Sequence, residues 1–285
     1  MIYLLDKYQT SKYWAAPHNN LLEAFLDLFR SVGLDCDYLG SNSVEEDDIL
    51  LAISAVAYDL SGYPCKIIVV NSESICLGAK SDGYLNRYIH NPNVKEIWDY
   101  SEQNVEKFPS ICSIPAYYVP ITYHPTFERI FKLNLDSPKD IDVCMYGCGG
   151  DRRALVKTQL VRKGHKVWLG STNSNSELER ILNRSKLVVI VHYYGDDLTI
   201  DYYRLFSLIS CKVLTIHETP SQNQLDDNMN RIIYADYGDI ANKCTEYLSM
   251  SQTERNAIAE ETYKWWKTKS LIDSIPFKTI QKPPV

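Results

Sequence analysis

The sequence lacks several features that would place it in a specialised class of protein. No run of about 18 apolar residues is present, so no membrane-spanning helix is expected. Positive charge is not in excess, because 30 Lys and Arg face 36 Asp and Glu and give a net charge of −6. We therefore expect no nucleic-acid partner. Short-period repeats and low-complexity tracts are missing, and an aromatic content of 12% argues against disorder.

The chain also lacks the pattern of a secretory signal. Met1 to Leu5 carry no basic residue, and the charged Asp6 follows before an apolar segment of sufficient length can form. Eight cysteines are present, but Cys144 and Cys148, the closest pair, have no second pair at metal-ligand spacing. The sequence therefore predicts a cytoplasmic protein whose thiols are free and mostly buried.

What is present is an alternation of strand-like and helix-like segments. Short apolar runs at 49–53, 66–70 and 187–191 are typical of strands that are buried on both faces. Segments of helical periodicity lie between such runs. The alternation occurs twice and predicts an α/β fold with largely parallel sheets in two domains. Three prolines between positions 115 and 125 indicate extended chain leading to an interdomain connection near 126–139.

Helix starts are expected where a capping residue precedes a helical pattern. Three pairs have the capping-box spacing, namely Asn20 with Glu23, Ser176 with Glu179, and Ser251 with Glu254. Asp151 is expected to cap a helix that runs to Lys163, and Lys212–Ile216 is expected to form a strand.

A glycine-rich turn follows the predicted strand 141–146. Gly147 and Gly149 let the backbone approach a ligand, and the next helix offers free N–H groups to an anion. Arg152 and Arg153 add charge suited to phosphate. The turn is neither a Walker loop, since no Gly-Lys-Ser/Thr follows, nor a dinucleotide fingerprint, since Arg152 replaces the third glycine. We interpret it as another kind of phosphate-binding turn; the alternative is a tight turn with two solvated arginines.

Polar residues also follow the other predicted strands of the second half, where ligands of parallel sheets bind. His192 and Tyr194 could stack on a base or hydrogen-bond a sugar, although a chain with 21 tyrosines brings tyrosines together by chance. Asp201 and Arg204 share one face at a helix start, and Glu218 ends the following strand. Asp201 could accept both hydroxyls of a ribose, but the helix dipole alone would also favour an acid there.

In this order and spacing, the second half resembles the nucleotide-sugar-binding half of GT-B glycosyltransferases of the group 1 kind. The matching segments are Asp142–Gly147 followed by Arg152 or Arg153, Glu177–Leu182, the strand reaching His192, Asp201–Leu205 and Val213–Glu218. In the first half, Val70–Ser74 and Ile97–Asn104 resemble segments of small glycosyltransferases encoded by large DNA viruses and by some bacteria and fungi.

The resemblance implies two Rossmann-like domains facing across a cleft. Residues 1–125 would bind the acceptor, a glycan or another hydroxyl compound, and residues 126–265 would bind a nucleotide sugar, with UDP expected first and GDP second. The tail, 266–285, would cross back to the first domain. The chain departs from the family at Asp201, where a ribose-binding glutamate is usual, and at 209–211, which replace a turn of small residues. A non-catalytic two-domain protein that binds a sugar or a nucleotide is the rival hypothesis.

The resemblance also implies a hexosyl- or pentosyltransferase that needs no cofactor. Helix N-termini and Arg152 or Arg153 could neutralise the leaving diphosphate, so no metal is expected. For the base we favour Glu73, which follows the strongest strand of the first half, before His18 and Asp6. The metal-dependent GT-A class uses Asp-x-Asp after a strand; Asp35–Asp37 and Asp140–Asp142 match those letters but precede strands. An NAD-dependent enzyme is a third hypothesis, which the failed fingerprint disfavours.

Overall fold

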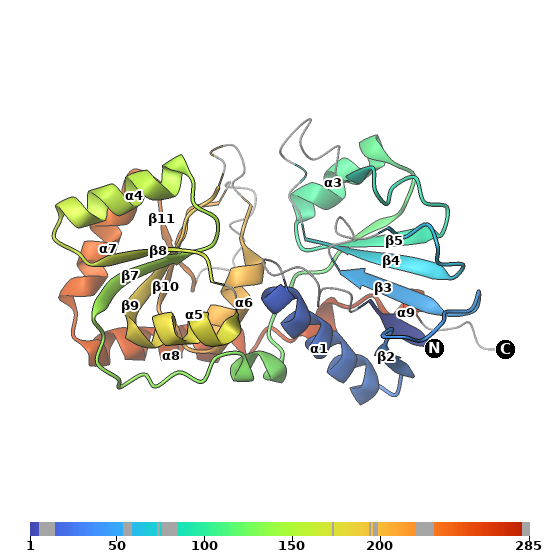
Figure 1. Ribbon diagram of the computed structural model, residues 1–285, viewed down its shortest axis with the longest axis horizontal. Helices are drawn as coiled ribbons and strands as arrows, with labels where there is room; N and C mark the ends of the chain where they lie inside the picture. Colours follow the sequence, from blue (N-terminus) through green and yellow to red (C-terminus); the bar gives the residue numbers. More distant parts are fainter. Residues whose placement is uncertain are drawn as a thin grey trace. The chain divides into compact units, whose positions relative to one another are not determined.

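The computed structural model describes residues 1–5, 15–53, 59–72, 75, 85–172, 174–193, 195, 199–220 and 231–280, and within 15–19 the backbone alone. The chain forms two compact units (Figure 1). The first unit comprises Met1–Thr122 and Ser270–Val285, and the second comprises Tyr123–Lys269. Among the described residues, no helix has the length and apolar character needed to cross a membrane.

The first unit is a six-stranded parallel sheet with helices and a returning C-terminal segment. Its strand order is β2-β1-β3-β4-β5-β6, and every pair of neighbours is parallel. In chain order its elements are β1 (Ile2–Leu4), α1 (Ala15–Ser31), β2 (Cys36–Tyr38), β3 (Ile49–Ile53), β4 (Lys66–Asn71), β5 (Val94–Asp99), α3 (Glu102–Ile111), β6 (Ala116–Tyr118), the 3-10 helix η6 (Leu271–Ser274) and α9 (Phe277–Ile280).

The central strands of this sheet are apolar because helices cover both faces of a parallel sheet. Leu50, Ile67, Val69 and Ile97 are buried in one hydrophobic core. The C-terminal segment belongs to the same unit: Leu271 and Ile280 are buried, and the Lys66 Nζ donates to the Thr279 carbonyl over 2.7 Å.

The second unit is a five-stranded parallel sheet of order β11-β10-β9-β7-β8. Helices α4 and α7 pack against each other, as do α6 and α8, and Figure 1 shows α4 and α5 on opposite sides of the strands. In chain order the elements are η3 (Pro125–Arg129), β7 (Ile141–Tyr146), α4 (Asp151–Arg162), β8 (Val167–Gly170), α5 (Asn175–Arg184), β9 (Ser185–Ile190), α6 (Tyr202–Ser210), β10 (Thr215–Glu218), β11 (Ile233–Ala235), α7 (Ile240–Ser249) and α8 (Gln252–Trp266).

The strand order places a topological switch point between β7 and β9. From β7 the chain crosses to β8 on one side, and it then returns to β9 on the other side of β7. Crossovers therefore leave this point in opposite directions, which opens a crevice beyond the carboxyl ends of the two strands. Residues that follow β7 and β9 line this point.

The prediction of two parallel-sheet α/β domains is confirmed. Several element boundaries differ from those expected. The first helix begins at Ala15, so Asn20 lies inside it; Ser174 caps α5 in place of Ser176; and Gly150 is the N-cap of α4, with Asp151 in its first turn. The strand expected from Lys212 begins only at Thr215, because Lys212 has a φ of 57° and ends α6 in a left-handed conformation.

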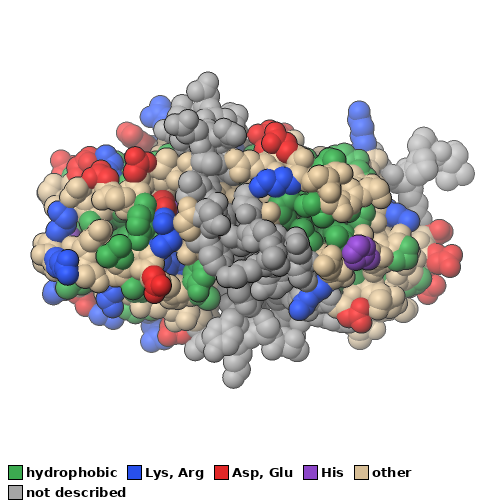
Figure 2. Space-filling model, turned by 90° about the horizontal axis from the view of Figure 1, so that it is seen from above, with side chains coloured by type: hydrophobic (Ala, Val, Ile, Leu, Met, Phe, Trp, Pro, Cys, Tyr) green, Lys and Arg blue, Asp and Glu red, His purple; other side chains and the backbone are tan. Residues whose placement is uncertain are grey.

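The described cysteines are all free thiols, and most are buried as expected. On the face seen in Figure 2, acidic and basic side chains of each unit are interspersed. Among its described residues, that face shows no broad patch of one charge.

Candidate functional site

The carboxyl edge of the second sheet gathers most of the residues singled out from the sequence. Arginines come from α4 and α6, Asp201 caps α6, His192 follows β9 and Glu218 ends β10. The described members are Gly147, Gly149, Arg152, Arg153, His192, Asp201, Arg204 and Glu218. Tyr194 lies outside the described residues.

Arg153 spans the switch point. Its Nε donates to the Val191 carbonyl beyond β9 over 3.0 Å, and its Nη1 donates to the Cys148 carbonyl in the turn after β7. The side chain is 5% exposed, and no ion pair with a carboxylate holds it within the described part of the chain. Burial, and then the charge of Arg204, lower the pKa of this guanidinium to about 10, which still leaves it protonated at neutral pH.

Arg204 is held by an acid of its own helix. Asp201 is the N-cap of α6, and its Oδ1 accepts the Arg204 backbone N–H over 3.0 Å while its Oδ2 accepts the Arg204 Nε over 2.7 Å. Burial alone would raise the pKa of Asp201, but the charge and hydrogen bonds of Arg204 keep it below its ordinary value. The Arg204 Nη1 donates to the Tyr146 carbonyl over 3.1 Å. The predicted Asp201–Arg204 face thus exists as an ion pair.

The two guanidinium groups converge on Gly147. A Cβ at this position would lie 3.2 Å from the Arg153 Nη1 and 3.7 Å from the Arg204 Nη1. The residue also has a φ of 118°, which side chains other than glycine rarely adopt. Glycine is therefore required here both by the backbone and by the approach of two positive charges.

The N-terminus of α4 adds its dipole to these charges. Its N-cap is Gly150, which has no side chain to accept the first N–H groups, so the cap residue makes no side-chain hydrogen bond there. Free N–H groups and a partial positive charge therefore face the turn. No described atom lies within 4 Å of a Cβ built on Gly149, so the described residues leave open space beside the turn. Together these groups suit an anion such as a phosphate.

Glu218 organises the other side of the site. It forms an ion pair with Arg152, and its Oε2 accepts the His192 backbone N–H over 2.9 Å and lies 3.1 Å from the His192 Nδ1. Arg152 also stacks on Tyr237, with 3.8 Å between its guanidinium carbon and the ring centre. Burial would raise the pKa of Glu218, but His192 and Arg152 hold it below its ordinary value. Of the two arginines predicted to meet phosphate, Arg152 is the one already neutralised by a carboxylate.

Sequence reasoning did not single out His217 as a site residue. This side chain is completely buried on β10, and its Nε2 accepts the Asp201 backbone N–H over 3.1 Å. Burial, and then His192, lower its pKa to about 4, so it is neutral at pH 7. A neutral imidazole fits its role as acceptor, since protonation would place two donors opposite each other. The only signal in the sequence was its place beside Glu218 at a strand end.

The three predicted bases fall outside the described side chains. Glu73 and Asp6 lie outside the described residues, and His18 lies in α1 among the residues whose side chains are not described. Within the described part of the chain, no group of three His, Cys, Asp or Glu side chains is placed to hold a metal ion.

A buried polar cluster lies at the carboxyl edge of the first sheet. Asp99 at the end of β5 is completely buried and accepts hydrogen bonds from the Asn71 Nδ2 (2.7 Å), the Ser101 N–H (2.8 Å) and the Asn104 Nδ2 (3.1 Å). The Asn104 Oδ1 accepts the Ile75 N–H over 3.2 Å. Burial raises the pKa of Asp99 to about 7, against these hydrogen bonds. The cluster joins β4, β5 and the start of α3.

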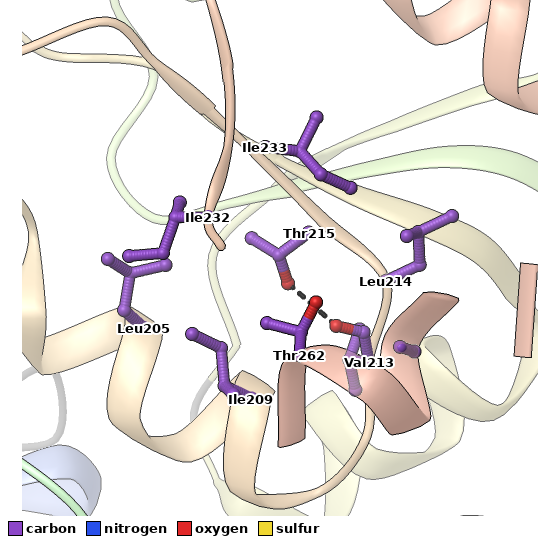
Figure 3. Close-up of a pocket in the computed structure, with 9 residues that line it drawn as sticks. Leu205, Ile209, Val213, Leu214, Thr215, Ile232, Ile233 and Thr262 are labelled. Atoms are coloured by element: carbon purple, nitrogen blue, oxygen red, sulfur yellow. Dashed lines mark hydrogen bonds between the residues drawn. The ribbon is translucent and has the colours of Figure 1, made fainter. Parts of the chain in front are cut away.

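A small cavity lies at the opposite edge of the second sheet (Figure 3). Its walls are mostly apolar and come from α6, α8 and the amino ends of β10 and β11; they include Leu205, Ile209, Leu214, Ile232 and Ile233. At about 10 Å³ it is on the scale of one water molecule. It is a packing defect and is unrelated to the charged cluster.

No family model matches the sequence. An uncharacterised protein of Acanthamoeba polyphaga mimivirus is 25% identical over 215 residues, which cover 73% of this chain and 71% of that protein.

Solved structures give a clearer likeness. T4 phage BGT in complex with its UDP-glucose substrate has a TM-score of 0.55 at 13% identity, covering 94% of each chain. AviGT4, a glycosyltransferase involved in avilamycin A biosynthesis, has a TM-score of 0.51 at 9% identity and covers 96% of this chain and 98% of that one. At these identities the likeness concerns the fold alone: two parallel-sheet α/β domains of the GT-B type.

Proposed function

We propose that this protein is a glycosyltransferase that moves a sugar from a nucleotide sugar to a hydroxyl group of a glycan or another acceptor. The nucleotide would bind at the carboxyl edge of the second unit, with UDP expected first and GDP second. The observation that carries the proposal is the convergence of Arg153 and Arg204 on Gly147, at the free N-terminus of α4. Arg153 is buried and has no ion pair among the described residues, and a buried charge without a partner is costly unless an anion joins it.

The fold suggests which anion would bind beside Arg153 and Arg204. BGT of T4 phage was solved with UDP-glucose, and that protein shares the two-domain architecture. By this analogy the anion would be the diphosphate of a nucleotide sugar, as the sequence resemblance to small viral glycosyltransferases also implies. The mimivirus relative is uncharacterised. That this chain belongs with the small glycosyltransferases of large DNA viruses is therefore a proposal.

The transfer step sets the tasks of the site. The acceptor oxygen forms a bond to the anomeric carbon, the bond from that carbon to the diphosphate oxygen breaks, and the leaving nucleoside diphosphate takes the electron pair. Arg153, Arg204 and the N–H groups of α4 would stabilise the charge that develops on that oxygen. Because these donors are fixed by Val191, Cys148 and Asp201, they need little reorganisation during the reaction.

We still propose that Asp201 contacts the ribose, but as a second role. Each of its carboxylate oxygens already accepts a hydrogen bond from Arg204. Only the remaining lone pairs could accept ribose hydroxyls. We therefore propose that Asp201 positions Arg204 first and contacts the ribose second. Glu218 would act by fixing Arg152 and His192 beside the donor.

The acceptor's proton would pass to a base in the first unit, and no metal would be needed. Glu73 is the first choice, with His18 and Asp6 next. Glu73→Gln keeps the shape of the side chain and removes its basicity, so turnover should fall while donor affinity stays within about twofold. If EDTA abolishes the activity and manganese restores it, the proposal that the transfer needs no metal is contradicted. Near wild-type turnover of Glu73→Gln would move the search to His18 and Asp6.

The proposal is tested by incubating the protein with a panel of UDP- and GDP-sugars and measuring free UDP or GDP. Slow donor hydrolysis without acceptor, faster with a suitable sugar acceptor, is the expected result. An Arg153→Ala/Arg204→Ala double variant should lose this release, and an Arg162→Ala variant at the exposed far end of α4 should keep it. Tight nucleotide-sugar binding without any release would favour a non-catalytic binding protein.

A further inference from the structure

An aromatic side chain, that of Tyr193, is exposed at the switch point. The large apolar side chains that are exposed in the described part of the second unit are Leu155, Val161 and Tyr193. Leu155 and Val161 belong to α4, whereas Tyr193 follows the carboxyl end of β9. It is 45% exposed although its neighbours Val191 and His192 are buried. An exposed ring at the ligand-binding edge of a parallel sheet is available for contact with a ligand.

Tyr193 lies directly beside the proposed phosphate site. A Cβ built on Gly150 would come within 3.1 Å of its ring, so the ring packs against the backbone at the start of α4. The Arg153 guanidinium carbon lies 5.7 Å from the ring centre. The same turn therefore presents phosphate-binding groups and an aromatic ring side by side. Gly150 permits this packing because it has no side chain.

We propose that Tyr193 is the platform on which the nucleobase of the donor stacks. This inference rests on the proposed function and adds a residue to it. A nucleoside diphosphate joins an aromatic base to its phosphates through a single ribose, so a base platform has to lie close to the phosphate site. Stacking uses the π-face that every base has, so the platform serves UDP or GDP and sets affinity more than it selects the base.

The experiment measures, by calorimetry on the full-length protein, the binding of UDP, GDP and inorganic pyrophosphate. Tyr193→Ala should weaken binding of the nucleotide that the wild type binds by roughly 5- to 150-fold, the range of one base–aromatic stack, and leave pyrophosphate affinity unchanged. Tyr193→Phe keeps the ring and should bind within about twofold of wild type. Tyr118→Ala removes an exposed tyrosine from the first unit and serves as the matched control.

Two results would overturn the inference while the proposed function stands: nucleotide affinity of Tyr193→Ala equal to wild type, or an equal loss of pyrophosphate affinity, which would assign Tyr193 to the phosphate site or to folding. A wild-type protein that binds pyrophosphate but neither UDP nor GDP, or binds none of the three, would overturn the proposed function and this inference with it.

Discussion

Arg153 supplies the buried positive charge of the proposed phosphate site. The sequence offered Arg152 and Arg153 as equal candidates for phosphate, because both stand at the start of one helix. The structure separates them, since Arg152 forms an ion pair with Glu218, whereas Arg153 donates to two backbone carbonyls and has no ion pair within the described part of the chain. That distinction depends on a residue 66 positions further along the chain, which no local pattern reveals.

Removal of this charge should weaken phosphate binding specifically. Arg153→Ala is expected to weaken UDP by ~1.5–3 kcal/mol, the range for hydrogen bonds to charged groups, and to leave uridine nearly unaffected. Calorimetry with both ligands measures the difference, and Arg162→Ala at the far end of α4 is the control. A similar loss for UDP and uridine would assign Arg153 to the shape of the site instead of to its charge.

Asp99 makes the stability of the first unit depend on pH. Its pKa in the folded protein is raised to about 7 by burial, above its ordinary value of 3.8. The stability tied to its protonated form is fully present below pH 4 and is lost as the pH rises through 7, by an amount on the order of 4 kcal/mol at most. Urea unfolding between pH 4 and pH 8 should show this decline, and Asp99→Asn should remove it. A variant with the same pH dependence as wild type would refute the assignment.

At the scale of elements, the sequence predicted a helix start best where two residues form a capping box, in which the side chain of each accepts the backbone N–H of the other. The capping box of Ser251 and Glu254 opens α8 as expected. The start of α5 was misplaced because two serines compete there: the Oγ atoms of Ser174 and Ser176 lie 3.0 Å apart, and Ser174 is the cap. Either serine could cap the helix by local chemistry alone. In the observed helix, which starts after Ser174, Leu178 and Leu182 are buried.

The C-terminal segment belongs to the first unit through contacts that no local pattern in the sequence reveals. Only the family resemblance implies that residues 266–285 cross back to the first domain. Leu271 is completely buried, and Lys66, which forms an ion pair with Glu96, donates from its Nζ to the Thr279 carbonyl. Leu271→Ala should therefore cost the first unit ~2–5 kcal/mol, as for other buried leucines, although the residue follows the second unit in sequence. Native-state hydrogen exchange would place the loss among β3, β4 and β5. Loss of protection confined to the strands of the second unit would contradict the assignment.

At the scale of the whole molecule, the fold class could be predicted from the hydrophobic periodicity of the sequence. The contacts between distant segments that build the candidate site could not. Apolar runs and glycine turns predict two parallel sheets because burial on both faces demands such runs. They do not reveal that His217 supports Asp201, since that contact joins the end of one strand to the start of a distant helix. The facing of the two domains across a cleft, the division of roles between them and the identity of the base stay predictions.

The central claim is that the nucleotide binds at the switch point of the second unit. Hydrogen–deuterium exchange of the full-length protein with and without UDP, and again with GDP, tests it most directly. We predict slower exchange at 147–153, at 191–193 and at 201–204, the segments that carry the glycine turn, Tyr193 and the Asp201–Arg204 pair. Protection by nucleotide confined to residues 1–122, with the second unit unchanged, would contradict the claim.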